Sequence, residues 1–126
     1  MAKRAGTPQT TLKNRVVVTG IGVHSGKQVS MALNPAAADT GIVFRRTDDP
    51  AAEQVAIRAS IDNLSATDSC TTIARMGLSI ATIEHLLASF NGLGVDNVAV
   101  EIDGAEVPMM DGSAGAFVAL IEEAGI

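Results

Sequence analysis

The chain has 126 residues, a formal net charge of −5 and 47% hydrophobic residues, with three Phe and neither Trp nor Tyr, so one domain with an aliphatic core is expected. Eight of its nine Lys and Arg residues occur by Arg58 and ten of its fourteen acidic residues follow it, which argues against nucleic-acid binding. No apolar run approaches the ~20 residues of a membrane span and no signal-peptide core follows Lys3 and Arg4, so a cytoplasmic protein without a membrane span is predicted.

Strands dominate the predicted elements. Residues 1–10 are polar and contain Pro and Gly, which predicts a flexible tail before a single domain over residues 11–126. The next strands are expected at residues 15–20 and 28–33, and a glycine-rich turn joins them into a hairpin. Segments rich in β-branched or alternating apolar residues predict further strands at 42–46, 55–58, 70–74 and 98–102.

Two amphipathic helices complete the predicted fold. Between residues 79 and 91, Ser79 suits an N-cap, Asn91-Gly92 suits a stop, and one helical arc is apolar. That arc consists of Ile80, Ile83, Leu86, Leu87 and Phe90. A second helix follows Asp111-Gly-Ser113 as its cap, with an apolar face of Phe117, Leu120, Ile121 and Ala124. These elements predict an α+β fold: a two-layer sandwich with a mainly antiparallel sheet of five or six strands packed on two helices.

Glu84 and His85 lie off the apolar arc of the first predicted helix. Their neighbours on the wheel are all short side chains, namely Ala81, Thr82, Ala88 and Ser89. An adjacent imidazole and carboxylate suit a metal-bound water, because the imidazole holds the metal and the carboxylate takes the proton of the water. The alternative is a surface Glu beside a partly buried His that bonds to backbone. With only two His in the chain, a complete catalytic zinc site is not expected within it, since such sites take three protein ligands.

Other polar residues leave two interpretations open. The glycine-rich stretch 19–27 lacks the Walker spacing and a following helix, so a hairpin turn is favoured over a phosphate loop. His24 is then either exposed on that turn or a second polar group near His85. Cys70, the only cysteine, excludes an internal disulfide and is either a structural thiol or a neighbour of His85. Asp111 is favoured as part of a helix cap rather than as a catalytic acid.

The combination of several motifs resembles the zinc-dependent UDP-3-O-acyl-N-acetylglucosamine deacetylases, which act in lipid A synthesis. The resemblance extends from about Thr11 to Ile126 and is much more specific than any one motif. Its motifs are Thr82-Ile-Glu-His85, Gly94-Val-Asp-Asn97, Met110-Asp-Gly-Ser113, Thr19-Gly-Ile-Gly-Val-His-Ser-Gly26 and Thr40-Gly-Ile-Val-Phe-Arg-Arg46. It implies the same two-layer α+β fold and corresponds to the first domain of these enzymes.

The resemblance also implies roles for individual residues. It places a general base on Glu84 and a zinc ligand on His85, and it puts His24 and Cys70 near the site that binds the acylated UDP-amino sugar. The remaining zinc ligands and the general acid belong to a second domain of the family, which packs on the helix layer of the first. The chain is therefore expected to be inactive alone and to dock, or self-associate, through the helix face that carries Glu84 and His85. The alternative is a non-catalytic paralogue that acts as an interaction or regulatory protein.

Overall fold

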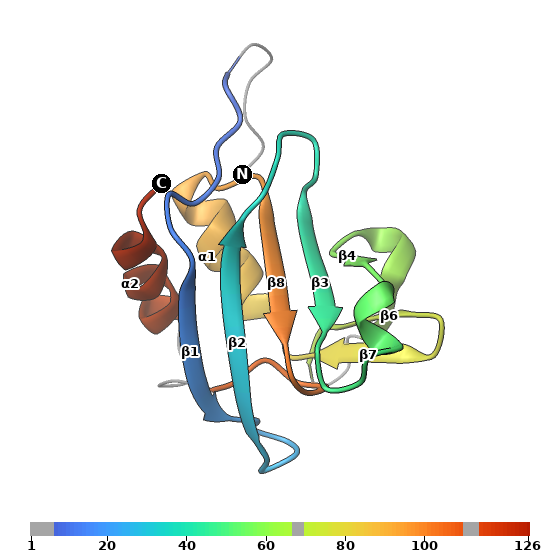
Figure 1. Ribbon diagram of the computed structural model, residues 1–126. Coiled ribbons are helices and arrows are strands. Elements are labelled where there is room, and N and C mark those ends of the chain that lie inside the picture. Colours follow the sequence, from blue (N-terminus) through green and yellow to red (C-terminus); the bar gives the residue numbers. More distant parts are fainter. Residues whose placement is uncertain (1–6, 67–69, 110–113) are drawn as a thin grey trace.

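The computed structural model describes residues 7–66, 70–109 and 114–126, and these form two layers (Figure 1). Two short 3-10 helices, Ala52–Gln54 and Ile61–Asn63, lie between the third and the fifth strand in the sequence. The main elements in chain order are β1 (Val16–Ile21), β2 (Gln28–Pro35), β3 (Ile42–Arg46), β4 (Ile57–Arg58), β5 (Leu64–Ala66), β6 (Thr72–Arg75), β7 (Leu78–Ala81), α1 (Glu84–Leu93), β8 (Val98–Ile102) and α2 (Ala114–Ala124).

The larger sheet has five strands in the order β1-β2-β8-β3-β4. All of its pairs are antiparallel except β3 and β8, which run parallel with Ile42 opposite Val98. A parallel pair needs a long crossover, and here the crossover carries the smaller sheet and α1. The central strand β8 alternates in burial: Val98, Val100 and Ile102 point into the core, while Ala99 and Glu101 are half-buried on the other face.

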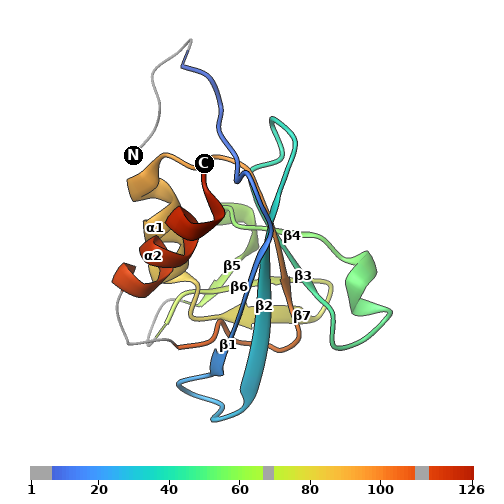
Figure 2. The same ribbon diagram turned by 60° about the vertical axis from the view of Figure 1, so that its left-hand side comes forward.

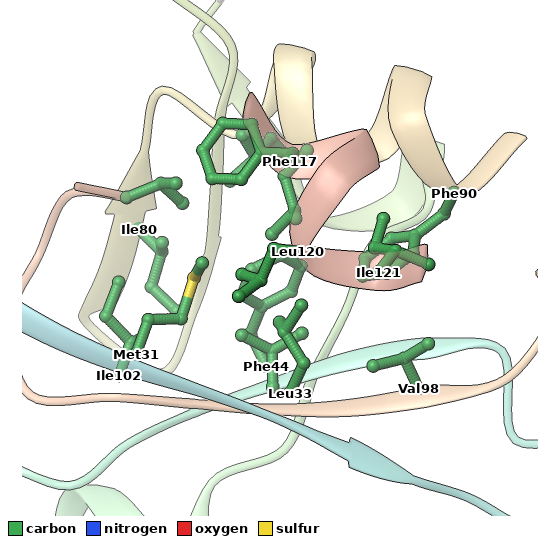
Figure 3. Packing of buried hydrophobic residues seen from close by; sticks show 14 of the residues in the cluster. Met31, Leu33, Phe44, Ile80, Phe90, Val98, Ile102, Phe117, Leu120 and Ile121 are labelled. Atoms are coloured by element: carbon green, nitrogen blue, oxygen red, sulfur yellow. The ribbon is translucent and has the colours of Figure 1, made fainter. Parts of the chain in front are cut away.

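Both helices cover the same face of the five-stranded sheet (Figure 2). The core lies between these layers, and Figure 3 shows Phe117 and Ile121 of α2 above Leu33 and Phe44 of the sheet. Phe90 of α1 joins the same cluster and is 1% exposed. In the part of the chain that the structure describes, neither helix is long and apolar enough to cross a membrane. The predicted α+β sandwich with an aliphatic core is confirmed.

A second, three-stranded antiparallel sheet with the order β5-β6-β7 was not anticipated from the sequence. Only β6 had been expected, as part of residues 70–74. β7 was assigned to the helix because Ile80 fits both a helical arc and a buried strand position. In the structure Ile80 pairs with Ile73 of β6, and both side chains contribute to the core. This sheet places Cys70 and the start of α1 next to each other.

Helix α1 therefore begins later than predicted, at Glu84 instead of Ser79. Ser79 belongs to β7 and is no N-cap, and Ile83 occupies the capping position without a side-chain hydrogen bond. The helix ends at Leu93, and Gly94 follows with φ of 71°. The Val95 N–H donates to Phe90 O and the Gly94 N–H to Asn91 O, the two bonds of a Schellman motif.

The segment Gly94-Val-Asp-Asn97 has a structural role of its own. Asn97 is 3% exposed, and its Oδ1 accepts a hydrogen bond from the Gly41 N–H while its Nδ2 donates to Gln9. The Asp96 carboxylate accepts from the Thr10 N–H. These contacts connect the start of β8 to the start of β3 and to residues 9 and 10. The rest of the predicted flexible tail, residues 1–6, and the predicted cap at Asp111 lie outside the described residues.

Candidate active site

Glu84 is the first residue of α1, and its carboxylate lies where the helix dipole favours negative charge. Its Oε2 accepts a hydrogen bond from the Thr71 N–H at 3.1 Å, which connects α1 to the start of β6. The Ile83 N–H donates to Thr71 O, so Thr71 binds both the Glu84 side chain and the backbone directly before the helix. Among the described residues, Glu84 Oε1 has no hydrogen-bond partner. The Thr71 N–H thus holds one of the two carboxylate oxygens.

His85 follows on the second position of α1 and is exposed. Its backbone oxygen accepts from the buried Ser89 hydroxyl at 2.8 Å, an ordinary bond within a helix. No hydrogen bond to its imidazole comes from the described residues. The exposed His85 therefore differs from the interpretation as a partly buried His held by backbone.

The exposed strip of short side chains beside Glu84 contains fewer residues than the helical wheel predicted. Because α1 begins at Glu84, Ala81 and Thr82 precede the helix, and Ser89 is 2% exposed rather than on the surface. Ala88 alone remains as a short exposed residue of the predicted strip on α1.

His24 lies on the turn between β1 and β2, so the predicted hairpin is confirmed. Its Nδ1 is 2.6 Å from Glu106 Oε2, and its side chain is 50% exposed. The Thr82 hydroxyl donates to the same Oε2 at 2.8 Å and lies 3.4 Å from His24 Nδ1. Since Thr82 is two residues before Glu84, the structure brings His24 to the start of the segment that carries Glu84 and His85.

Glu106 is a buried carboxylate that the sequence analysis did not single out. It is 4% exposed and accepts from the backbone N–H groups of His24 and Ser25 as well as from the two side chains just described. Burial raises the pKa of this carboxyl, but the hydrogen bonds from His24, Ser25 and Thr82 outweigh burial and lower the pKa to about 2. Glu106 is therefore ionised at neutral pH.

Cys70 also lies near the start of α1. It directly precedes Thr71, whose N–H binds Glu84, and its Sγ is 3.8 Å from the Thr72 hydroxyl. The thiol is half-buried. Cys70 and His24 thus approach the Glu84 segment from the smaller sheet and from the hairpin, respectively, so all four residues predicted for the site lie around the start of α1.

Residues 9–126 match the sequence profile of the UDP-3-O-acyl N-acetylglycosamine deacetylase family. The chain belongs to this family. It is 54% identical over 119 residues to the UDP-3-O-acyl-N-acetylglucosamine deacetylase of Marinobacter nauticus and equally to that of Chromohalobacter salexigens. The deacetylase of Methylococcus capsulatus is 50% identical over 118 residues. Each match covers 94% of this chain and 38% of the relative, so the chain spans little more than a third of their length.

The donor set around α1 fits part of a metal site. The exposed imidazole of His85 is a suitable zinc ligand, and the carboxylate of Glu84 lies on the adjacent residue. The residues described by the structure contain no group of three or more His, Cys, Asp and Glu that could hold a metal ion. The described part of this deacetylase-family chain thus contains no complete metal site.

The hairpin carries a sequence signal that could have revealed Glu106. A Cβ at Gly22 would collide with Glu106 Oε1, and one at Gly20 would lie 2.7 Å from Met109 O. These glycines leave room for Glu106, Pro108 and Met109, which pass close to the hairpin. A carboxylate followed by the buried residues Val107 and Pro108 is a second signal, since an acidic residue in a buried segment needs partners.

Proposed function

We propose that this chain supplies the general base and one zinc ligand to a UDP-3-O-acyl-N-acetylglucosamine deacetylase of lipid A synthesis, and that it is inactive alone. The observation that carries the proposal is the position of Glu84 and His85 at the start of α1, each with an open atom. Family membership supports it, because the relatives with 54% identity are named as deacetylases of this substrate. The remaining ligands would come from the part of the enzyme that corresponds to the unmatched length of those relatives.

In this proposal Glu84 removes a proton from the attacking water. The Thr71 N–H fixes Oε2 at 3.1 Å, which orients the carboxylate and leaves Oε1 to accept the proton. The positive end of α1 stabilises the ionised carboxylate before the transfer. His85 would hold zinc, whose chemistry when bound is to polarise the acetamide carbonyl and to acidify the water. His24 and Cys70 would line the site from its other sides.

The test is a chimaera in which this chain replaces the matching segment of the Marinobacter nauticus deacetylase. We expect the chimaera to hydrolyse the acylated UDP-amino sugar and the isolated chain to be inactive. Glu84→Gln keeps the shape of the side chain but cannot accept the proton, so kcat should fall by roughly 100-fold or more. His85→Ala should remove both zinc and activity. Liberated amine and bound zinc are measured on the same preparations.

Glu101→Gln is the matched control for the chimaera. Glu101 lies on the face of the sheet away from the helices and binds Arg15 and Asn34, so its loss should leave kcat unchanged. A folded chimaera that retains full activity with Glu84→Gln would overturn the proposed base. Hydrolysis by the isolated chain would overturn the statement that its part of the site is incomplete.

A further inference from the structure

Glu106 has a buried carboxylate to which the proposed reaction assigns no role. Its two oxygens accept hydrogen bonds from two separate segments. The first segment is the hairpin turn, through the N–H groups of His24 and Ser25 at 3.0 to 3.1 Å and through His24 Nδ1 at 2.6 Å. The second is the link between β7 and α1, through the Thr82 hydroxyl at 2.8 Å. Glu106 therefore joins the hairpin to the residues directly before Glu84.

The link at Thr82 has an unfavourable backbone conformation. Its φ is 63°, in the left-handed region that β-branched residues rarely adopt. The neighbouring backbone is held by the segment that contains Glu106, since the Ala81 N–H donates to Ala105 O and the Val107 N–H donates to Ala81 O. The hydroxyl bond to Glu106 adds a side-chain contact at the strained residue itself. Glu106 is thus connected to Glu84 through Thr82, which binds Glu106 and lies two residues before Glu84 in the sequence.

An ionised carboxylate can only accept hydrogen bonds, so every group that binds Glu106 has to donate. His24 must then carry a proton on Nδ1, and in the neutral ring Nε2 is left as an acceptor. The low pKa of Glu106, about 2, keeps it in this accepting form throughout the neutral range. Because the His24 side chain is 50% exposed, the tautomer decides which hydrogen-bonding groups of a ligand the ring can bind.

Holding the hairpin would not by itself require a carboxylate. Oε1 accepts from the two backbone N–H groups, and the carbonyl oxygen of an amide could do the same. Oε2 accepts from the Thr82 hydroxyl, from His24 Nδ1 and also from the His24 N–H, and an amide would put an NH₂ donor at that position. Since Oε1 already binds both backbone N–H groups, the need for a second acceptor oxygen comes from His24 Nδ1 and the Thr82 hydroxyl.

We propose that Glu106 is a positioning residue that fixes His24 as the Nδ1–H tautomer and so presents Nε2 as an acceptor. The group it would receive is a hydroxyl or amide N–H, as on an amino sugar. The location of that ligand near Glu84 rests on the proposed function, whereas the tautomer of His24 does not. The two parts can accordingly be tested apart.

The tautomer is tested on this chain by ¹⁵N NMR of labelled histidine at a pH where the ring is neutral, with His24→Asn to assign the signals. We expect His24 in the folded protein to show a protonated Nδ1, although neutral imidazole in water favours protonation on Nε2. Glu106→Gln should move the proton to Nε2, and Glu101→Gln should leave the spectrum unchanged. A wild-type His24 protonated on Nε2 would overturn the proposal even if Glu106→Gln failed to fold.

The role of the pair is tested in the chimaera. Removal of the residue that orients a functional His typically costs ten- to hundredfold, so Glu106→Gln should lower kcat/KM by about that factor. Glu106→Gln added to His24→Gln should then cost nothing further, because one acts through the other. Additive losses would overturn the positioning role. If Glu84→Gln proves fully active while the NMR result holds, the proposed base is wrong and the tautomer assignment stands.

Discussion

The carboxyl group of Glu106 changes its proton affinity when the chain folds. Its ordinary pKa is 4.5, and although burial raises it, the hydrogen bonds from His24, Ser25 and Thr82 lower it to about 2 in the folded protein. A lowered pKa means that the folded state binds this proton less tightly than the unfolded state. The resulting stabilisation is complete above the ordinary pKa and is lost as the pH falls toward about 2. The interval between these pKa values corresponds to about 3 kcal/mol.

Glu106→Gln should remove this pH dependence. We expect the free energy of unfolding of the wild type to lose about 3 kcal/mol more than that of the variant between neutral pH and pH ~2. Urea unfolding followed by circular dichroism over a pH series measures the difference. Glu101→Gln also removes one carboxylate, but from an exposed pair with Arg15, and should change the pH dependence far less. If the difference in unfolding free energy between wild type and Glu106→Gln stayed constant over the pH series, the lowered pKa of Glu106 would be contradicted.

Single residues of the site differed in how readily the sequence revealed them. Glu84 and His85 stood out because they are adjacent, polar and off an apolar arc, and these are local properties. Glu106 did not, because its partners are His24 and Ser25, more than 80 residues earlier in the chain. The positive φ of Thr82 was also hidden, since nothing in a Thr residue indicates a left-handed backbone. The catalytic and metal-binding roles of Glu84 and His85 stay predictions.

At the level of elements, two strands were predicted to the residue and the helix start was not. β3 and β8 occur at residues 42–46 and 98–102 as expected, because their β-branched residues alternate in burial or lie between clear turns. The predicted start of α1 is five residues too early. Ile80 and Ile83 fit the apolar arc of a helix as well as they fit a strand followed by a turn. Short apolar segments carry this ambiguity whenever their tertiary partners are unknown.

The end of α1 offers a matched pair of glycine substitutions. Gly94 has φ of 71°, so Gly94→Ala should destabilise the protein by about 1 kcal/mol. Gly92 lies within the helix, and a Cβ there meets no atom within 4 Å, so Gly92→Ala should stabilise by roughly 0.5 kcal/mol. Thermal unfolding of the two variants should therefore shift in opposite directions. A stabilising Gly94→Ala would rule out the left-handed helix end.

At the scale of the whole molecule, the candidate site lies at one end of the helix layer, around the start of α1. His24 from the hairpin, Cys70 from the smaller sheet and Glu84 from α1 come from three separate parts of the fold. The hydrophobic core between the sheet and the helices (Figure 3) and the hydrogen bonds of Glu84 and Glu106 hold these parts together. The described residues nevertheless provide no three-ligand cluster for a metal. The capacity to bind zinc is thus a property to be measured on the entire chain.

We expect the isolated chain to hold zinc weakly. A single imidazole with a neighbouring carboxylate falls short of the three protein ligands of a catalytic zinc site, so dialysis should leave well under one zinc per chain. Elemental analysis after dialysis gives the zinc content, and sedimentation of the same sample gives the oligomeric state. His85→Ala is the control for metal bound elsewhere. One tightly bound zinc in a monomer would contradict the expectation, whereas a dimer that shares ligands would reveal the self-association predicted for the helix face.

The central place of β8 has a consequence for how the chain is made. β8 pairs with both β2 and β3, yet it is synthesised after the four other strands of the five-stranded sheet. Until residue 98 emerges from the ribosome, the β1–β2 and β3–β4 hairpins have no strand to connect them. During that interval β2 and β3 each expose an unpaired edge, the kind of surface on which strands of other chains can add. We therefore expect a product that stops before β8 to aggregate more readily than one that includes β8, because its β2 and β3 edges stay unpaired.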